Sequence, residues 1–139
     1  MPRAKPQARP VGLSDARSYL DKAQDFLRAA QHALELSNHT AAVGNAVHAG
    51  IAAGDALSAA RAGTVWRGEH AQAAGHLEAA GDEGRQAGRQ LRRLLPMKTR
   101  AEYDPAPMKA ADARTAVQAA ERMVALAVQA LASVPGDDR

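Results

Sequence analysis

Three polar side chains stand among alanines and glycines in the stretch GNAVHAGIAAGDALSAARAG, residues 44–63. His48 follows Asn45 by three positions and Asp55 follows His48 by seven, so a helix would place all three on one face. Histidine and aspartate can transfer protons or bind a metal ion. Because His48 and Asp55 would lie two turns apart, a shared ion would need a ligand from another helix. The stripe therefore predicts either a functional cleft or hydrogen bonds to a neighbouring helix or a second subunit.

A second group of chemically useful residues is basic. The chain from Gly84 to Arg100 contains six cationic side chains and no acidic residue. Arginine suits paired hydrogen bonds to phosphate, so this helix face is a candidate phosphate-binding surface. The alternative is an ordinary solvated face. The residues expected to bind phosphate are Arg85, Arg89, Arg92 and Lys98.

The sequence KTRAEYDP continues this basic run to the expected end of its helix. Arg100 and Tyr103 could clamp a phosphate there together with Lys98. Alternatively, the two cations cap the helix C-terminus and the tyrosine packs as a plug.

Composition excludes several classes of protein. The 139 residues include no cysteine, which removes disulfides and thiolate metal sites. The motifs GxxxxGK[ST], GxGxxG after a strand, HExxH and GxSxG are absent. No stretch approaches the roughly 20 apolar residues of a membrane span, and the opening MPRAKPQARPVG lacks the apolar run of a signal peptide. We therefore expect a cytoplasmic protein with no membrane segment, no metal and no cofactor.

Apolar residues recur at helical spacing throughout the chain, and no strand pattern is present. The pattern predicts an all-α, up-down bundle of four long helices and one short helix within a domain spanning 13–133. The expected helices span residues 15–36, 41–62, 70–80 and 109–132, with a further helix that begins at 83. Pro96 is expected to kink or end this further helix. Residues 1–12 are expected to be a disordered basic tail and 134–139 a frayed end.

Small residues dominate the expected core. Alanine supplies about a quarter of the chain and aromatic residues only 3%. Gly50 and Gly54 fall on the apolar stripe of the second helix, together with Val43, Val47 and Leu57. We expect the two glycines to let a neighbouring helix approach closely, in return for a cost of about 1 kcal/mol each in helix propensity.

The order of these features resembles the HEPN domain superfamily. The segment SYLDKAQDFLRAAQHALELSNHTAAVGNAVHAGIAAGDAL is similar to the first two helices of these domains. KTRAEYDP is similar to the R-x-A-D/E-Y stretch that ends their fourth helix, and AADARTAVQAAERMVALAVQAL is similar to their closing helix. This resemblance implies a four- or five-helix bundle, often a homodimer with a cleft between subunits. Many members are metal-independent ribonucleases, or toxins paired with a nucleotidyltransferase antitoxin. In those enzymes an arginine and a histidine spaced R-x4-6-H act together.

The sequence contains no arginine and histidine at the R-x4-6-H spacing. Arg28 and His32 are separated by three residues on the first helix, and Arg67 and His70 by two. Our leading hypothesis is a HEPN-like homodimer that binds RNA or nucleotide phosphates as part of a toxin–antitoxin or defence system. One alternative is a toxin-like ribonuclease with His48 as acid or base, Arg100 stabilising the transition state and Tyr103 beside them. Another is a non-catalytic subunit that binds a protein partner.

Overall fold

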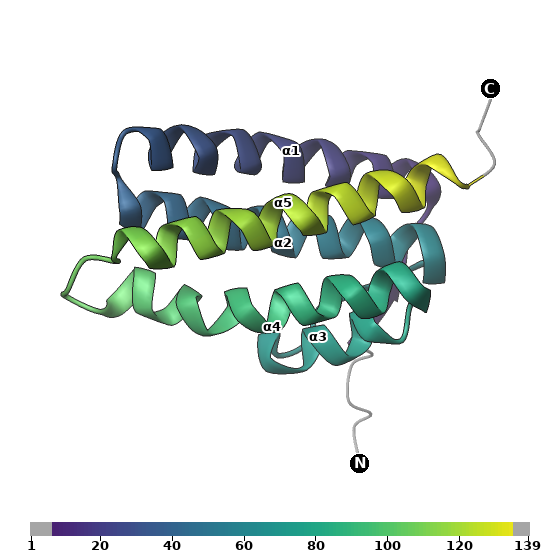
Figure 1. Cartoon of the computed structure of the whole chain (residues 1–139). Coiled ribbons are helices and arrows are strands. Elements are labelled where there is room, and N and C mark those ends of the chain that lie inside the picture. Colours follow the sequence, from purple (N-terminus) through teal and green to yellow (C-terminus); the bar gives the residue numbers. More distant parts are fainter. Residues whose placement is uncertain (1–6, 135–139) are drawn as a thin grey trace, which may run out of the picture.

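The computed structural model describes residues 7–134 and shows a helical bundle (Figure 1). The four long helices run alternately up and down, and the short helix packs on the outside of the helix that follows it in the chain. The prediction of an all-α bundle is confirmed. The helices are α1 (Leu13–Glu35), α2 (His39–Ala62), α3 (His70–Glu78), α4 (Gly81–Tyr103) and α5 (Ala110–Ala132).

Helix α2 is the centre of the bundle. It packs against α1, α4 and α5, while α5 also contacts α1 and α4. Alanine makes this possible, because its small side chain lets several helices approach one axis at once. Leu57, Leu94 and Met123 supply the largest fully buried side chains between these alanines.

The expected close approach at Gly50 and Gly54 is present. A Cβ atom added to Gly50 would lie 2.5 Å from Cδ1 of Leu94 on α4 and 3.1 Å from the sulfur of Met123 on α5. At Gly54 it would lie 3.2 Å from Cδ2 of Leu77 on α3. The two glycines therefore occupy the part of α2 on which α3, α4 and α5 converge, and their lack of a side chain allows this close approach.

Two short strands were not predicted. β1 (Ala8–Pro10) pairs antiparallel with β2 (Thr64–Trp66), which follows α2. The segment 8–10 was expected to belong to a disordered tail, and its backbone hydrogen bonds to β2 correct that expectation. Residues 1–6, and the part of the expected frayed end from 135 to 139, lie outside the described residues.

Pro96 does not end α4. The helix continues to Tyr103, although proline lacks the N–H that would bond to the carbonyl of Arg92. Packing on both sides compensates for this loss, because Leu94 is fully buried before the proline and Met97 and Ala101 pack on the core after it. As a result Lys98 and Arg100 extend from a helix that spans the bundle. Within residues 7–134 no helix is long and apolar enough to cross a bilayer.

Candidate functional site

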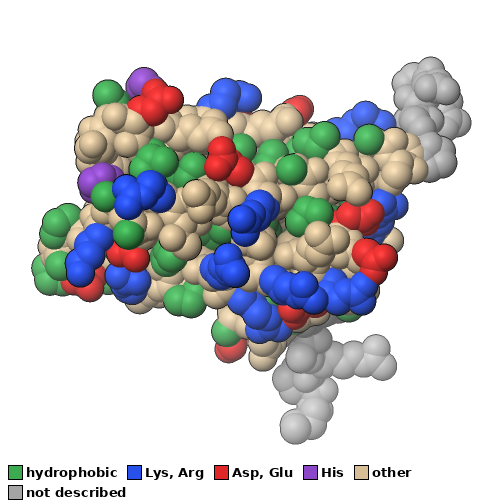
Figure 2. Space-filling model, viewed as in Figure 1, with side chains coloured by type: hydrophobic (Ala, Val, Ile, Leu, Met, Phe, Trp, Pro, Cys, Tyr) green, Lys and Arg blue, Asp and Glu red, His purple; other side chains and the backbone are tan. Residues whose placement is uncertain are grey.

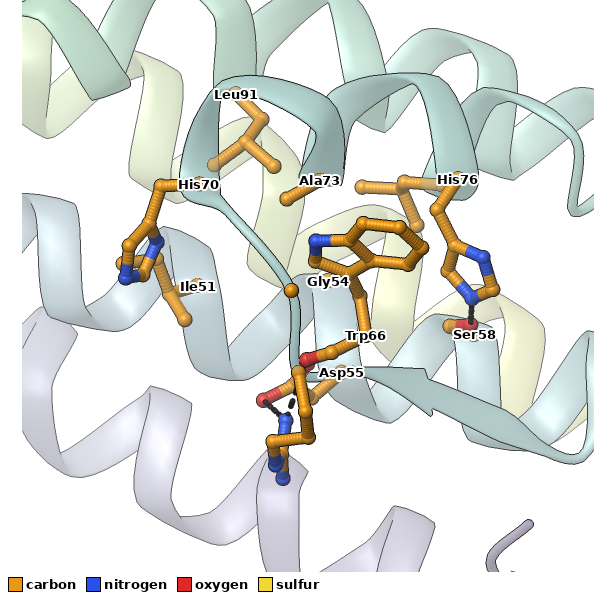
Figure 3. A pocket seen from close by; sticks show the side chains of 12 residues that line it. Ile51, Gly54, Asp55, Ser58, Trp66, His70, Ala73, His76 and Leu91 are labelled. Carbon is orange, nitrogen blue, oxygen red and sulfur yellow. Dashed lines mark hydrogen bonds and ion pairs between the residues drawn. The ribbon is translucent and has the colours of Figure 1, made fainter. Parts of the chain in front are cut away.

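A pocket of about 180 Å³ opens beside the C-terminal half of α2 (Figure 3). Its walls come from α2, the segment that joins β2 to α3, α3 itself and one residue of α4. The lining residues are Ile51, Gly54, Asp55, Ser58, Trp66, Arg67, Gly68, His70, Ala73, His76, Leu77 and Leu91. The pocket thus combines an apolar floor with acidic, basic and aromatic side chains.

Asp55 and Arg67 form the charged side of the pocket. Nη1 of Arg67 lies 3.4 Å from Oδ2 of Asp55 and also donates to the carbonyl of Trp66 at 2.8 Å. Nη2 donates to the hydroxyl of Tyr19 on α1 at 2.7 Å. Burial raises the pKa of Asp55 to about 6, although the nearby charges of Arg67 and Lys22 pull it down. The carboxyl group is therefore poorly solvated and only weakly compensated.

Trp66 and His76 form the aromatic side. Their ring centroids are 5.2 Å apart with planes tilted by 34°. Trp66 is fixed by its indole N–H, which donates to the carbonyl of Glu69 at 2.9 Å. Nε2 of His76 lies 3.2 Å from the hydroxyl oxygen of Ser58, a buried residue of α2, and 3.3 Å from that of Thr64. This network joins α2, β2 and α3 and holds the indole in place.

The backbone around β2 sets these side chains at the pocket. Gly63 caps the C-terminus of α2, and its φ of 69° lies in the left-handed region that glycine adopts without steric cost. The chain then reverses into β2 and pairs with β1, and the Arg67 amide donates to the Gln7 carbonyl at 2.6 Å. The N-terminal segment therefore holds in place both β2, which ends at Trp66, and the adjoining residue Arg67.

His70 begins α3 and belongs to two hollows. It lines the pocket and also a shallower depression of about 490 Å³ along α4. Arg92 and Lys98, two of the residues expected to bind phosphate, line that depression with Leu95 and Pro96. The pocket and part of the basic run therefore adjoin the same residue, His70.

Acidic side chains from elsewhere accompany the basic run. Figure 2 shows basic and acidic groups side by side over α4 and α3. Arg92 pairs with Glu78 of α3 and lowers the pKa of that carboxyl group. Arg89 makes no ion pair with any residue between 7 and 134. The remaining pairs are Arg85 with Asp82, Lys98 with Glu102 and Arg100 with Asp112. Two of these partners, Glu78 and Asp112, come from other helices, so the sequence of α4 alone did not reveal them.

The other expected site residues are spread along the bundle. Asn45 donates to the carbonyl of Ala41 on its own helix at 2.9 Å. His48 is exposed, and its ring centroid lies 5.2 Å from that of Phe26 on α1. Tyr103 is 78% exposed at the far end of α4. His48, Arg100 and Tyr103 line neither the pocket beside α2 nor the depression along α4, and of the α2 stripe only Asp55 lines the pocket.

Sequence reasoning did not assign Arg67, His70 or His76 to a site. The available clue was the segment TVWRGEH, which places tryptophan, arginine and histidine close together in a break between helices. Their convergence with Asp55 depends on how that break folds over α2. The described residues contain no cluster of three or more histidine, aspartate or glutamate side chains that could hold a metal ion.

The fold and site define a small helical-bundle protein with a pocket of mixed apolar and charged lining at the side of its central helix. The HEPN domain family model matches residues 16–131, and the chain belongs to this family. Comparisons with curated proteins and with solved structures give no match.

Proposed function

We propose that this HEPN-domain protein binds RNA or nucleotide phosphates through the pocket beside α2 and the adjoining depression along α4. The observation that carries the proposal is that the two hollows adjoin, with His70 lining both. One supplies the Trp66 ring and the Arg67 guanidinium, and the other supplies Arg92 and Lys98. Aromatic rings that stack on bases, next to cations that contact phosphates, are the usual means of binding single-stranded RNA.

The test removes cations from the depression without reversing their charge. Replacing Arg92 and Lys98 by glutamine should weaken the binding of a single-stranded RNA about tenfold and flatten its salt dependence. Fluorescence anisotropy of a labelled RNA at several salt concentrations measures both effects. Glutamine retains hydrogen-bonding capacity and avoids placing a new carboxylate beside Glu78.

A matched control removes the same charge from another face. Arg114 and Arg122 are exposed on α5 and line neither hollow. Their double replacement by glutamine should leave RNA binding nearly unchanged. Equal losses in the two double variants would mean that binding follows net charge, and the proposed site would be wrong.

We further propose that the protein acts as a homodimer, as HEPN domains commonly do. Sedimentation equilibrium of the full chain measures this directly. A monomer at micromolar concentration that still binds RNA would retain the site and remove the dimer from the proposal.

Ribonuclease activity is the second candidate, and the pocket's composition favours it. His70 and His76 could transfer protons beside the cation of Arg67, which is the chemistry that RNA cleavage requires. The sequence-based alternative uses His48 with Arg100 and Tyr103 instead. Incubating RNA with the wild-type protein, His70→Ala and His48→Ala separates the two assignments, since only the histidine that transfers a proton is required. The absence of cleavage by the wild type would leave a binding protein.

A further inference from the structure

We infer that the pocket beside α2 accepts a guanine base, with Asp55 as the residue that distinguishes guanine from the other bases. The inference rests on the proposed function and names the ligand chemistry of the same site. It follows from the aromatic wall of the pocket, from the unused hydrogen-bonding capacity of one carboxylate, and from the pattern of donors on the four bases.

The pocket wall includes the face of a fixed aromatic ring. In Figure 3, the side chains of His70 and Trp66 extend to opposite sides of the segment 66–70, and both line the pocket. An added Cβ at Gly68 would meet the side chains of Gln7 and Trp66, and one at Gly54 would meet those of Leu77 and Met123, so both glycines let neighbouring side chains pack closely around the pocket. The indole is held by Glu69 and backed by His76, which makes it a fixed stacking surface.

Asp55 supplies the polar edge. Its Oδ2 has the 3.4 Å contact with Arg67, and its Oδ1 makes no hydrogen bond with any residue in the described part of the chain. The guanidinium is shared with Tyr19 and the carbonyl of Trp66, so it does not fully satisfy the carboxylate. Burial has already raised the pKa of this group to about 6. A ligand that offers N–H donors would relieve that desolvation.

Guanine matches this requirement better than the other bases. An ionised carboxylate only accepts hydrogen bonds. Guanine presents two adjacent N–H donors, on N1 and on the exocyclic amine, so both carboxylate oxygens can accept at once. Adenine and cytosine each place a ring acceptor beside their amino group, and uracil flanks its single N–H with two carbonyls. Those acceptors would face the carboxylate and be repelled by it.

The single tryptophan of the chain provides the assay. Because Trp66 lines the pocket, its fluorescence should report occupancy directly. Titration with GMP, AMP, CMP and UMP at pH 7.5, where Asp55 is ionised, should give a Kd for GMP at least about tenfold below the others. A parallel titration uses a short single-stranded RNA with one guanine and its adenine-substituted counterpart, which separates a free nucleotide from an RNA base as the source of the ligand.

Asp55→Asn tests the assigned residue, and Asp25→Asn, an exposed position on α1, is the matched control. Asp55→Asn should lose the preference for guanine by weakening GMP about tenfold while leaving AMP nearly unchanged. The control should retain the preference. Equal binding of the four nucleotides, or a preference that survives Asp55→Asn, would overturn the inference. RNA binding without base preference would leave the proposed function intact, whereas the absence of all RNA and nucleotide binding would overturn both.

Discussion

Gly84 is the position where a single added methyl group tests the packing of this fold most directly. It lies on α4 and faces the end of α3, and a Cβ atom placed there would overlap the backbone carbonyl oxygen of Leu77. The same atom would lie 3.0 Å from the Cβ of Ala80 and 3.5 Å from Cδ2 of Leu57. A backbone carbonyl cannot rotate away as a side chain can, so α3 would have to shift outwards.

The expected magnitude follows from two opposing terms. Replacing an interior helical glycine by alanine stabilises a helix by up to about 1 kcal/mol. Overpacking costs roughly 1–3 kcal/mol, and contact with backbone places Gly84 near the upper limit. We therefore expect Gly84→Ala to lower the free energy of unfolding by about 2 kcal/mol.

Gly44 provides the matched control. It also lies within a helix, but nothing outside its own helical turn lies within 4 Å of an added Cβ. Gly44→Ala should therefore raise the free energy of unfolding by up to about 1 kcal/mol. Urea unfolding followed by far-UV circular dichroism compares both variants with the wild type. If Gly84→Ala were as stable as Gly44→Ala, α3 would not be docked this closely on α4, and the pocket wall it forms would be misplaced.

Three further predictions concern charge and backbone. For Asp55, the folded pKa of about 6 lies above the ordinary value of 3.8, so the folded state holds its proton more tightly and this group's contribution to stability falls as pH rises through that interval. Asp55→Asn should gain stability relative to the wild type by roughly 3 kcal/mol between about pH 4 and pH 7, measured by urea unfolding across that range, and a constant difference would contradict the assignment. Pro96→Ala restores an N–H to the interior of α4 and should raise the free energy of unfolding by up to about 3 kcal/mol, measured by urea unfolding. If the free energy did not rise, the helix would already be adapted to the proline. Arg61 donates to both carboxylate oxygens of Glu83, at 2.7 and 3.1 Å, and to the Ser133 hydroxyl, so Arg61→Gln should cost about 1 kcal/mol in the same assay, while Arg28→Gln, which breaks an exposed pair with Asp25, should change little.

The candidate site could be predicted only in part. Asp55 was singled out because it stands on an α2 face with His48 and Asn45, yet only Asp55 reaches the pocket. The difference arises because the segment after α2 folds back over the C-terminal half of that helix and brings Arg67 to Asp55. Helical spacing alone shows which residues share a face, but it does not show which part of the face another segment will cover.

The basic run illustrates the same limit for electrostatics. No acidic residue occurs from Gly84 to Arg100, which suggested a free cationic face. Glu78 and Asp112 approach Arg92 and Arg100 from α3 and α5 and neutralise part of that charge. Charge along a helix is a property of sequence, whereas the field at its surface also depends on the helices packed beside it.

Sequence by itself determined the helical class, the bundle and the close approach at Gly50, because hydrophobic periodicity and small residues act locally and repeat many times along the chain. It also carried the family resemblance through the order of its helical segments. Only the tertiary structure decided that α4 passes through Pro96, that β1 clamps β2, and that Asp55, Arg67, Trp66, His70 and His76 meet in one pocket. These features depend on contacts between residues far apart in the chain, where packing and long-range hydrogen bonds outweigh the preferences of any single segment.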